Sequence, residues 1–540
     1  MVKSRHEGAM KRNPVRLKLC SLVFVVGSAG CDTLWSNVAE DCEFTLMCEH
    51  HRGLWDGTGG GIPNPACDAD PTQNPSTVTD ECAVFASAMA EAGGDGTKAK
   101  PYASLGEAVA KANGKRVLAC TSGAFGESVT IEAGVEVIGG FDCKAGWTWS
   151  AEARSALEGR AGQIALRLTE TASGAKVRSF AVTAANAKEP GGSSIGVAVA
   201  DVEAELAQVD VTAGDGMAGE DGMTPTEAPQ AGAGAPTNVS NACTALVYGG
   251  DPGVTACEDG ETRGGVGGLG GIITTEGGNG LKGADGAPLP EPNADASGLG
   301  GTGQTDPDGD CKPGTVGKSG TRGMAGVAST DTTLTLAGIV GGDGENGTVG
   351  MRGQGGGGGG GAKAGLFCPG PSMSTVEGVG ASGGGGGAGG CGGKGGGGGQ
   401  AGGSSIGIVS LGTKLVLTDV TVAVGEGGKG GNGAAGQLGG SGGTGAAGGT
   451  APAAPAIPGC KGGDGGRGGA GGPGAGGRGG HAVGIAYAAA ASATLELKEF
   501  IVGTAGDGGS AGPGGSEQSA GAQGASGICW NFATNESCAQ

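Results

Sequence analysis

A repeated spacing of apolar residues constrains the fold of this chain more than any other feature. Residues 191–216 align without a gap on residues 402–427. Within both blocks an apolar residue is followed by another two positions on, by a third three positions further, and usually by a fourth two beyond that. We call this pattern a kernel. The chain holds five copies: Ala175, Val177, Phe180, Val182; Ala204, Leu206, Val209, Val211; Leu334, Leu336, Ile339; Leu415, Leu417, Val420, Val422; and Leu495, Leu497, Phe500, Val502.

The kernel predicts two short strands joined by a bend. Steps of two place side chains on one face of a strand, and the single step of three marks the place where a second inward-facing strand begins. The first two kernels lie 29 residues apart, and further alternating strands precede them at 164–168 and 195–199. Three short strands per repeat predict an all-β fold, a parallel β-helix (solenoid) whose coils bury their apolar faces by stacking. An antiparallel sandwich is the alternative.

A short helix is expected to cover the first coil, because an uncovered sheet edge would pair with other chains. In residues 101–114 apolar side chains recur on one helical face, and Ser104 with Glu107 matches a capping box. The first strands are expected at 116–120, 129–131 and 135–137.

Glycine accounts for 131 of the 540 residues and lies mainly after residue 190. Four kernels run into a Gly-acid-Gly sequence that predicts a turn, so long glycine-rich insertions are expected to leave the β-helix from one corner. In 427–448 and 459–480 glycine recurs at every third position, but the proline that collagen needs is almost absent. Two alternatives stay open for these tracts: flexible linkers, or left-handed polyglycine helices packed side by side.

The first thirty residues predict an export signal. A basic segment precedes an apolar run at 19–26, and small residues lead to Cys31. The sequence Ser28-Ala-Gly-Cys31 resembles the lipobox of bacterial lipoproteins, with Ser28 where that motif usually has Leu. We expect Cys31 to carry a lipid that anchors the protein to a membrane; ordinary cleavage after Ala29 is the alternative.

The cysteines predict disulfides. The chain has 16 Cys, and an even number remains after Cys20 leaves with the signal and Cys31 is acylated. No two of the rest have the close spacing of a zinc site. Cys120 with Cys143, Cys243 with Cys257 and Cys529 with Cys538 are the expected local pairs, although sequence does not determine connectivity.

Two acidic groups make calcium the only cofactor that the sequence suggests, since carboxylate oxygens are its preferred ligands. Asp306, Asp308 and Asp310 alternate as in calcium loops, but Cys311 and Gly317 depart from the EF-hand pattern. The second group would be a ladder along one corner of the β-helix, formed by Asp215, Asp343, Glu426 and Asp507. A solvated acidic turn is the alternative.

The opening segment, with its helix and first strands, resembles the start of right-handed β-helix proteins of the pectate-lyase-like class. With the export signal and the glycine-rich remainder, the chain resembles uncharacterised glycine-rich (PGRS-like) exported lipoproteins of myxobacteria. This resemblance implies a right-handed parallel β-helix with long glycine-rich loops, held at the outer membrane or cell surface.

The leading functional hypothesis is a non-enzymatic cell-envelope lipoprotein with a structural, adhesive or matrix-binding role. The formal net charge of −20 excludes nucleic acid as a partner, because such binding needs a basic surface. Two G-x-S-x-G matches, at 192–196 and 403–407, lead into strands rather than helices and do not predict a hydrolase. The alternative is a β-helix enzyme acting on polysaccharide, a lyase or glycoside hydrolase. Four basic residues lie in or beside the kernels: Lys176, Arg178, Lys414 and Lys498. They are too sparse to predict an enzyme site, and we assign no catalytic residue.

The expected organisation follows from these features: a signal peptide at 1–30, a Cys-containing linker at 31–95, the capped start of the β-helix at 96–213, glycine-rich insertions at 214–327, 341–401 and 425–483, further coils at 328–340, 402–424 and 484–505, and a glycine-rich, Cys-containing tail at 506–540.

Overall fold

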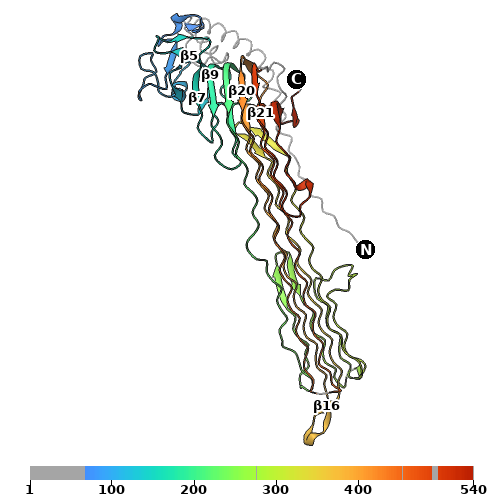
Figure 1. The fold of residues 1–540 in the computed structure, drawn as a ribbon. Helices are drawn as coiled ribbons and strands as arrows, with labels where there is room; N and C mark the ends of the chain where they lie inside the picture. Colours follow the sequence, from blue (N-terminus) through green and yellow to red (C-terminus); the bar gives the residue numbers. More distant parts are fainter. Residues whose placement is uncertain (1–66, 275, 453, 489–496, 539–540) are drawn as a thin grey trace, which may run out of the picture.

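The computed structural model describes residues 67–274, 276–452, 454–488 and 497–538. The predicted signal and Cys31 lie outside the described residues. Figure 1 shows two parts, a strand-rich head and a long narrow rod that extends from it.

Two largely parallel sheets form the head, which confirms the all-β class. The strands of the first sheet are β1 (Ala83–Ala86), β2 (Arg116–Cys120), β5 (Glu136–Asp142), β9 (Ala175–Ala184), β11 (Ala204–Ala213), β20 (Thr421–Val424) and β22 (Glu499–Ile501), with β3 (Ala124–Phe125), β6 (Thr148–Trp149), β7 (Ser155–Glu158) and β19 (Leu415–Thr418) beside them. The strands of the second sheet are β4 (Val129–Ile131), β8 (Leu166–Leu168), β10 (Ser194–Val199), β18 (Ser405–Ser410), β21 (Ala482–Tyr487), β23 (Ser526–Asn531) and β24 (Glu536–Ser537). Only the β5–β6 and β23–β24 pairs in these two sheets are antiparallel.

The strand register confirms the kernel alignment for three copies. Ala175 of β9 lies beside Ala204 of β11, and Ala204 lies beside Leu415 of β19. In the second sheet Ile195 pairs with Ile406, which is the partner that the ungapped alignment predicts. Each step of three in these kernels contains a left-handed residue, with φ of 58° at Ser179, 54° at Gln208 and 52° at Asp419. The predicted bend is therefore a repeated backbone feature.

The third and fifth kernels depart from the prediction. Leu334 and Ile339 pair with each other in an antiparallel hairpin of β14 (Thr332–Thr335) and β15 (Gly338–Gly341), because the chain reverses at Gly338, whose φ of 117° favours glycine. Leu334 packs against the outer side of the second sheet. In the fifth kernel Phe500 lies beside Val422, although equivalent positions would place it beside Val420; Leu495 lies outside the described residues. Because Leu334 and Ile339 lie in the hairpin β14–β15, the prediction of a β-helix coil at 328–340 is wrong.

The head is capped as predicted, with one change of partner. Helix α4 (Leu105–Ala110) begins at Ser104, whose Oγ accepts from the Glu107 N–H at 3.0 Å. The Glu107 side chain, expected as the second half of the capping box, pairs with Lys111 at 2.7 Å instead, and Glu127 accepts from the Leu105 N–H at 2.6 Å. Residues 67–95, expected as linker, belong to the head through β1, and residues 526–537 of the expected tail complete the second sheet.

The glycine-rich insertions form the rod, so the alternative of flexible linkers is wrong for the described residues. Their segments run side by side and hydrogen-bond at every third residue: the N–H groups of Gly344, Gly347 and Gly350 donate to the carbonyls of Gly399, Gly396 and Gly393 at 2.8–2.9 Å. A three-residue period is that of the polyproline II helix, which has no internal hydrogen bonds. Residues 214–216, 425–427 and 506–508 are extended chain that enters the rod, rather than the turns we expected.

The all-glycine run 355–361 lies at the centre of the rod and is buried. Successive N–H groups donate to three different segments, with Gly356, Gly357 and Gly358 bonding to Gly387, Thr315 and Ala284. Three further segments donate to the carbonyls of the same run. A Cβ on Gly358 would lie 2.0 Å from the Val266 carbonyl oxygen. Every position of the run must therefore be glycine.

Short elements complete the described chain. The rod carries two antiparallel hairpins, β12 (Val254–Cys257) with β13 (Gly260–Arg263) and β16 (Gly365–Pro369) with β17 (Thr375–Gly378). Single 3₁₀ turns occur at η2 (Pro75–Thr77), η3 (Glu276–Gly278), η4 (Pro371–Met373) and η5 (Glu517–Ser519).

Six disulfides join the described cysteines. The predicted pairs Cys120–Cys143 and Cys529–Cys538 are confirmed, and Cys67 pairs with Cys82. The predicted pairing of Cys243 with Cys257 is wrong, because the rod brings residues that are distant in sequence together: its three disulfides are Cys243–Cys368, Cys257–Cys391 and Cys311–Cys460. Such bonds place the protein in an oxidising compartment.

Replacing the central glycine in Gly358→Ala should destabilise the rod by about 3 kcal/mol or more, because its Cβ would displace a backbone carbonyl. Gly234→Ala is the matched control, since the nearest atom to its Cβ would be the Thr444 hydroxyl oxygen at 3.2 Å, with the Thr444 carbonyl oxygen at 3.5 Å. Its effect should be less than about 1 kcal/mol. Thermal unfolding followed by circular dichroism compares the two; equal melting temperatures would contradict the packed-glycine rod.

Candidate functional site

The first predicted calcium group is an exposed turn. The Asp306 carboxylate accepts from the Asp308 N–H at 3.1 Å, and Asp310 precedes the disulfide-bonded Cys311. Among the described residues, no cluster of three or more His, Cys, Asp or Glu side chains is arranged to hold a metal.

The second predicted group is not a single ladder. Asp215 and Glu426 are neighbours, and the Asp215 carboxylate accepts the Glu426 N–H at 2.8 Å. Asp343 accepts from the Ala401 N–H at 2.6 Å on another pair of segments. Asp507 lies one triplet further along the rod, where its carbonyl accepts the Gly430 N–H. Two of these four carboxylates thus bind backbone N–H groups of neighbouring segments.

Short polar side chains also bind backbone N–H groups where the glycine segments leave the head. Ser194 and Ser405, the serines of the two G-x-S-x-G matches, accept the N–H groups of Gly214 and Gly425 at 2.9 Å. Their hydroxyls therefore fasten the first residues of two glycine segments to the head. We did not predict this role; the sequence signal was the repeat of the motif at the same place in both aligned blocks.

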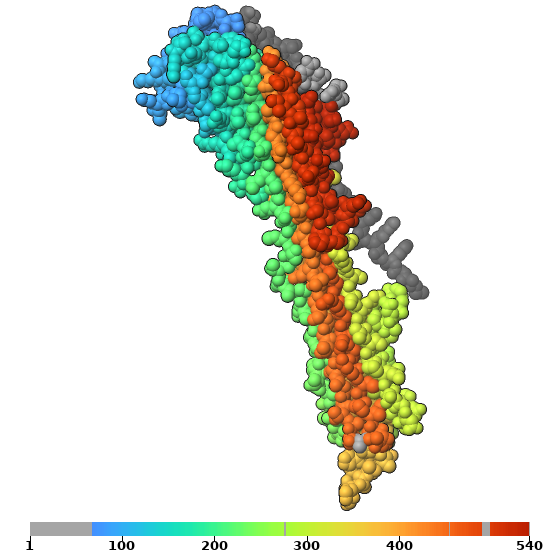
Figure 2. All heavy atoms as spheres, viewed as in Figure 1, coloured from blue at the N-terminus to red at the C-terminus, as the bar shows by residue number. Residues whose placement is uncertain are grey.

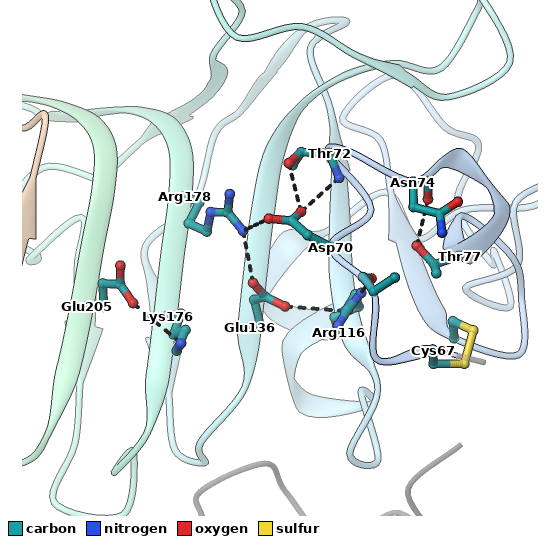
Figure 3. A network of polar contacts seen from close by, with 12 residues as sticks. Cys67, Asp70, Thr72, Asn74, Thr77, Arg116, Glu136, Lys176, Arg178 and Glu205 are labelled. Atoms are coloured by element: carbon teal, nitrogen blue, oxygen red, sulfur yellow. Dashed lines mark hydrogen bonds and ion pairs between the residues drawn. A yellow bond between two sulfur atoms is a disulfide. The ribbon is translucent and has the colours of Figure 1, made fainter. Parts of the chain in front are cut away.

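A charged depression of about 400 Å³ lies on the outer face of the first sheet. Figure 3 shows Arg178 between Asp70 and Glu136, with Nη1 at 2.9 Å and 3.3 Å from their carboxylates. Arg116 Nε lies 3.3 Å from Glu136, and Lys176 Nζ lies 3.5 Å from Glu205. Cross-strand register creates this row, in which basic and acidic side chains alternate from β2 to β11. Lys176 and Arg178, which we judged too sparse to form a site, thus belong to a cluster.

The electrostatics of this depression favour structure over catalysis. Partial burial opposes ionisation of Asp70, but hydrogen bonds from Thr72 and Arg178 outweigh it and lower the pKa of Asp70. A general acid needs a raised pKa instead. Arg178 connects strand β9 to the segment that contains Asp70, so the cluster ties the N-terminal part of the head to its sheet.

The far end of the rod carries a second candidate site, which we call the distal tip and define as residues 243–248, 271–274 and 365–378. Hairpin β16–β17 projects beyond the glycine segments (Figure 1). The Cys243–Cys368 disulfide and the packing of Phe367 near Ala362 and Ala381 fix the hairpin to the rod. The Gly271 N–H donates to the Ala362 carbonyl at 2.8 Å, which places 271–274 beside the base of the hairpin.

The distal tip is apolar and exposed. Met373 is completely exposed at 102%, Leu366 is 61% exposed and Leu246 is 74% exposed. Tyr248, Ile273 and Val376 are also exposed. Glu377 is the one charged residue in the ranges that define the tip. Figure 2 shows the hairpin as a narrow protrusion at the end of the rod. Exposed apolar groups concentrated in this way typically mark an interaction surface.

A buried histidine lies where the rod meets the second sheet. His481 Nδ1 accepts from the Ala525 N–H at 3.0 Å, and its ring contacts Trp530 and Phe532. Burial, with a smaller effect of the Arg478 charge, lowers the pKa of His481 to about 3. The neutral ring is therefore a part of the folded structure, and it holds segment 520–525 against the start of β21.

The pH dependence of stability should report this histidine. Between the folded pKa of about 3 and the ordinary value of 6.5, the unfolded chain binds a proton that the folded chain does not. Stability should therefore fall as the pH drops through this window, by up to about 1.4 kcal/mol per pH unit from this group. His481→Gln keeps an acceptor for the Ala525 N–H without titrating, so its unfolding free energy should fall less steeply. Urea unfolding at pH 4 and pH 7 measures both slopes; identical slopes would contradict the buried neutral ring.

Comparisons with protein-family models, curated proteins and solved structures found no match to this chain. Within the described residues, no helix has the length and apolar character needed to cross a bilayer.

Proposed function

We propose that this protein is a non-enzymatic adhesive protein of the cell envelope, in which the glycine rod holds the distal tip away from the membrane. The observation that carries the proposal is an ordered rod ending in an exposed apolar hairpin that a disulfide pins in place. A flexible tether would not hold the hairpin at a defined distance, whereas packed, cross-linked segments do.

For the head, we propose a right-handed parallel β-helix. The chain passes alternately between the two sheets from β8 to β11 and again from β18 to β23. Coils separated by 29 residues pair in parallel, as in β9 with β11. This pattern is the one that stacked coils produce, with the glycine segments as insertions between them.

For the cellular location, we propose export and a lipid anchor on Cys31 at the outer membrane or cell surface. The disulfides support an oxidising location. The resemblance to glycine-rich exported lipoproteins of myxobacteria belongs to the same proposal. Because the anchor precedes the head in the chain, the head would be tethered to the membrane and the rod would hold the tip away from it.

We favour adhesion over polysaccharide cleavage because of the charged depression. Its carboxylates are ion-paired with Arg116 and Arg178, and the lowered pKa of Asp70 leaves it ionised. The depression also mixes both charges, so it does not favour an anionic polymer. Calcium is not part of the proposal, since Asp215 and Asp343 already bind backbone N–H groups.

Adhesion should depend on the distal tip. In the double variant Leu366→Ser/Met373→Ser, beads coated with the exported chain should bind whole cells at least about 10-fold less than beads with the unaltered chain, because the two most exposed apolar side chains of the hairpin are lost. Leu438→Ser is the matched control, since Leu438 is 69% exposed on a glycine segment outside the tip. Equal bead binding by the unaltered chain and the double variant would contradict the proposed function.

A further inference from the structure

We propose that the partner of the distal tip is a lipid bilayer, into whose outer leaflet hairpin β16–β17 inserts. The inference rests on the adhesive function proposed above and names the partner of that site. Together with a lipid on Cys31, it would make the protein a bridge between two membranes.

The shape of the tip favours lipid over a protein surface. Specific protein interfaces bury about 800 Å² on each partner, which requires matching surfaces of many residues. The tip instead presents a narrow protrusion (Figure 2), with Met373 in the turn between β16 and β17 and Leu366 in β16, where it pairs with Glu377. A bilayer can close around such a protrusion, and binding then grows with the apolar area inserted.

The backbone of the hairpin turn is suited to leaving water. An N–H group without a partner is costly in an apolar medium. Pro369 and Pro371 have no N–H, and the N–H groups of Gly370 and Ser374 donate within the turn to Ser374 O at 2.8 Å and Pro371 O at 3.2 Å. The Ser374 hydroxyl also donates to the Pro371 carbonyl, at 2.7 Å. Much of the polar backbone at the point of insertion is therefore already satisfied.

The charge distribution selects the kind of lipid. The tip ranges contain one charged residue, Glu377, and the whole chain has a formal net charge of −20. Anionic lipid surfaces would repel such a protein, because they attract basic segments. Neutral zwitterionic lipids impose no such penalty, so apolar insertion should be strongest there. Strands of four and five residues at about 3.3 Å per residue are about 13–17 Å long, so the hairpin would reach no further than one leaflet, whose hydrocarbon layer is about 15 Å thick.

Vesicle flotation tests the inference. The exported chain with Cys31→Ser, which removes the anchor, is mixed with vesicles of phosphatidylcholine alone or with added phosphatidylserine. The chain and its Leu438→Ser control should float with phosphatidylcholine vesicles, and Leu366→Ser/Met373→Ser should float at least 10-fold less. Addition of phosphatidylserine should weaken binding. Equal melting temperatures of the variants show that loss of flotation is not loss of folding.

A gain-of-signal variant provides the second measurement. Tryptophan prefers the membrane interface, so Met373→Trp should retain flotation and its fluorescence should shift to shorter wavelength when phosphatidylcholine vesicles are added. No flotation of the unaltered tip or no spectral shift would overturn the lipid partner, and stronger binding to vesicles with phosphatidylserine would overturn the preference for neutral lipid. If bead adhesion still required Leu366 and Met373 in that case, the adhesive function would stand and the partner would be a protein or glycan.

Discussion

The rod depends on one contact, in which a glycine Cα lies against the carbonyl of a neighbouring segment at a distance that leaves no room for a Cβ. Three-residue helices have no internal hydrogen bonds, so each N–H and carbonyl must find a partner on another segment. Around residues 355–361 these partners come from every side, and a Cβ at Gly358 would lie 2.0 Å from an oxygen. Glycine loses the most entropy on ordering, so the saturated hydrogen bonding of the central run and the three disulfides of the rod offset a large cost.

The head supplies the register that the rod continues. Ser194 pairs with Ser405 in the second sheet, an offset of 211 residues. Near the start of the rod the same offset recurs, where Asp221 accepts the Asn432 N–H at 2.6 Å, whereas toward the tip the offset is 209 residues, where Asn241 accepts the Thr450 N–H at 2.8 Å. Ser194 and Ser405 bind the first glycine N–H groups of both segments. Parallel strands therefore align the segments before the glycine contacts begin, and the offset then changes by two residues between Asp221 and Asn241.

Local patterns predicted the head better than the rod. The kernel spacing identified the register of β9, β11 and β19 and the bend at Ser179, because both follow from side-chain periodicity. The prediction for the third kernel was wrong because a hairpin and a bent coil can have the same spacing of apolar residues. The period of three in 427–448 was visible, but a packed helix and a free linker have the same composition. Cys257 forms its disulfide with Cys391, which is 134 residues away in sequence and lies close only in the folded rod. The charged row on β5 and β9 could not be predicted without the strand register. The distal tip could not be predicted without knowing which loops lie together at the end of the rod.

Amide hydrogen exchange resolved to peptides tests the central claim most directly. If the glycine segments pack as described, the amides of 355–361 and 386–390 should exchange as slowly as those of strand β10, since all are buried and hydrogen-bonded to other segments. Exchange of these glycine amides at the rate of an unstructured chain, with β10 still protected, would contradict an ordered rod and the position of the tip that depends on it.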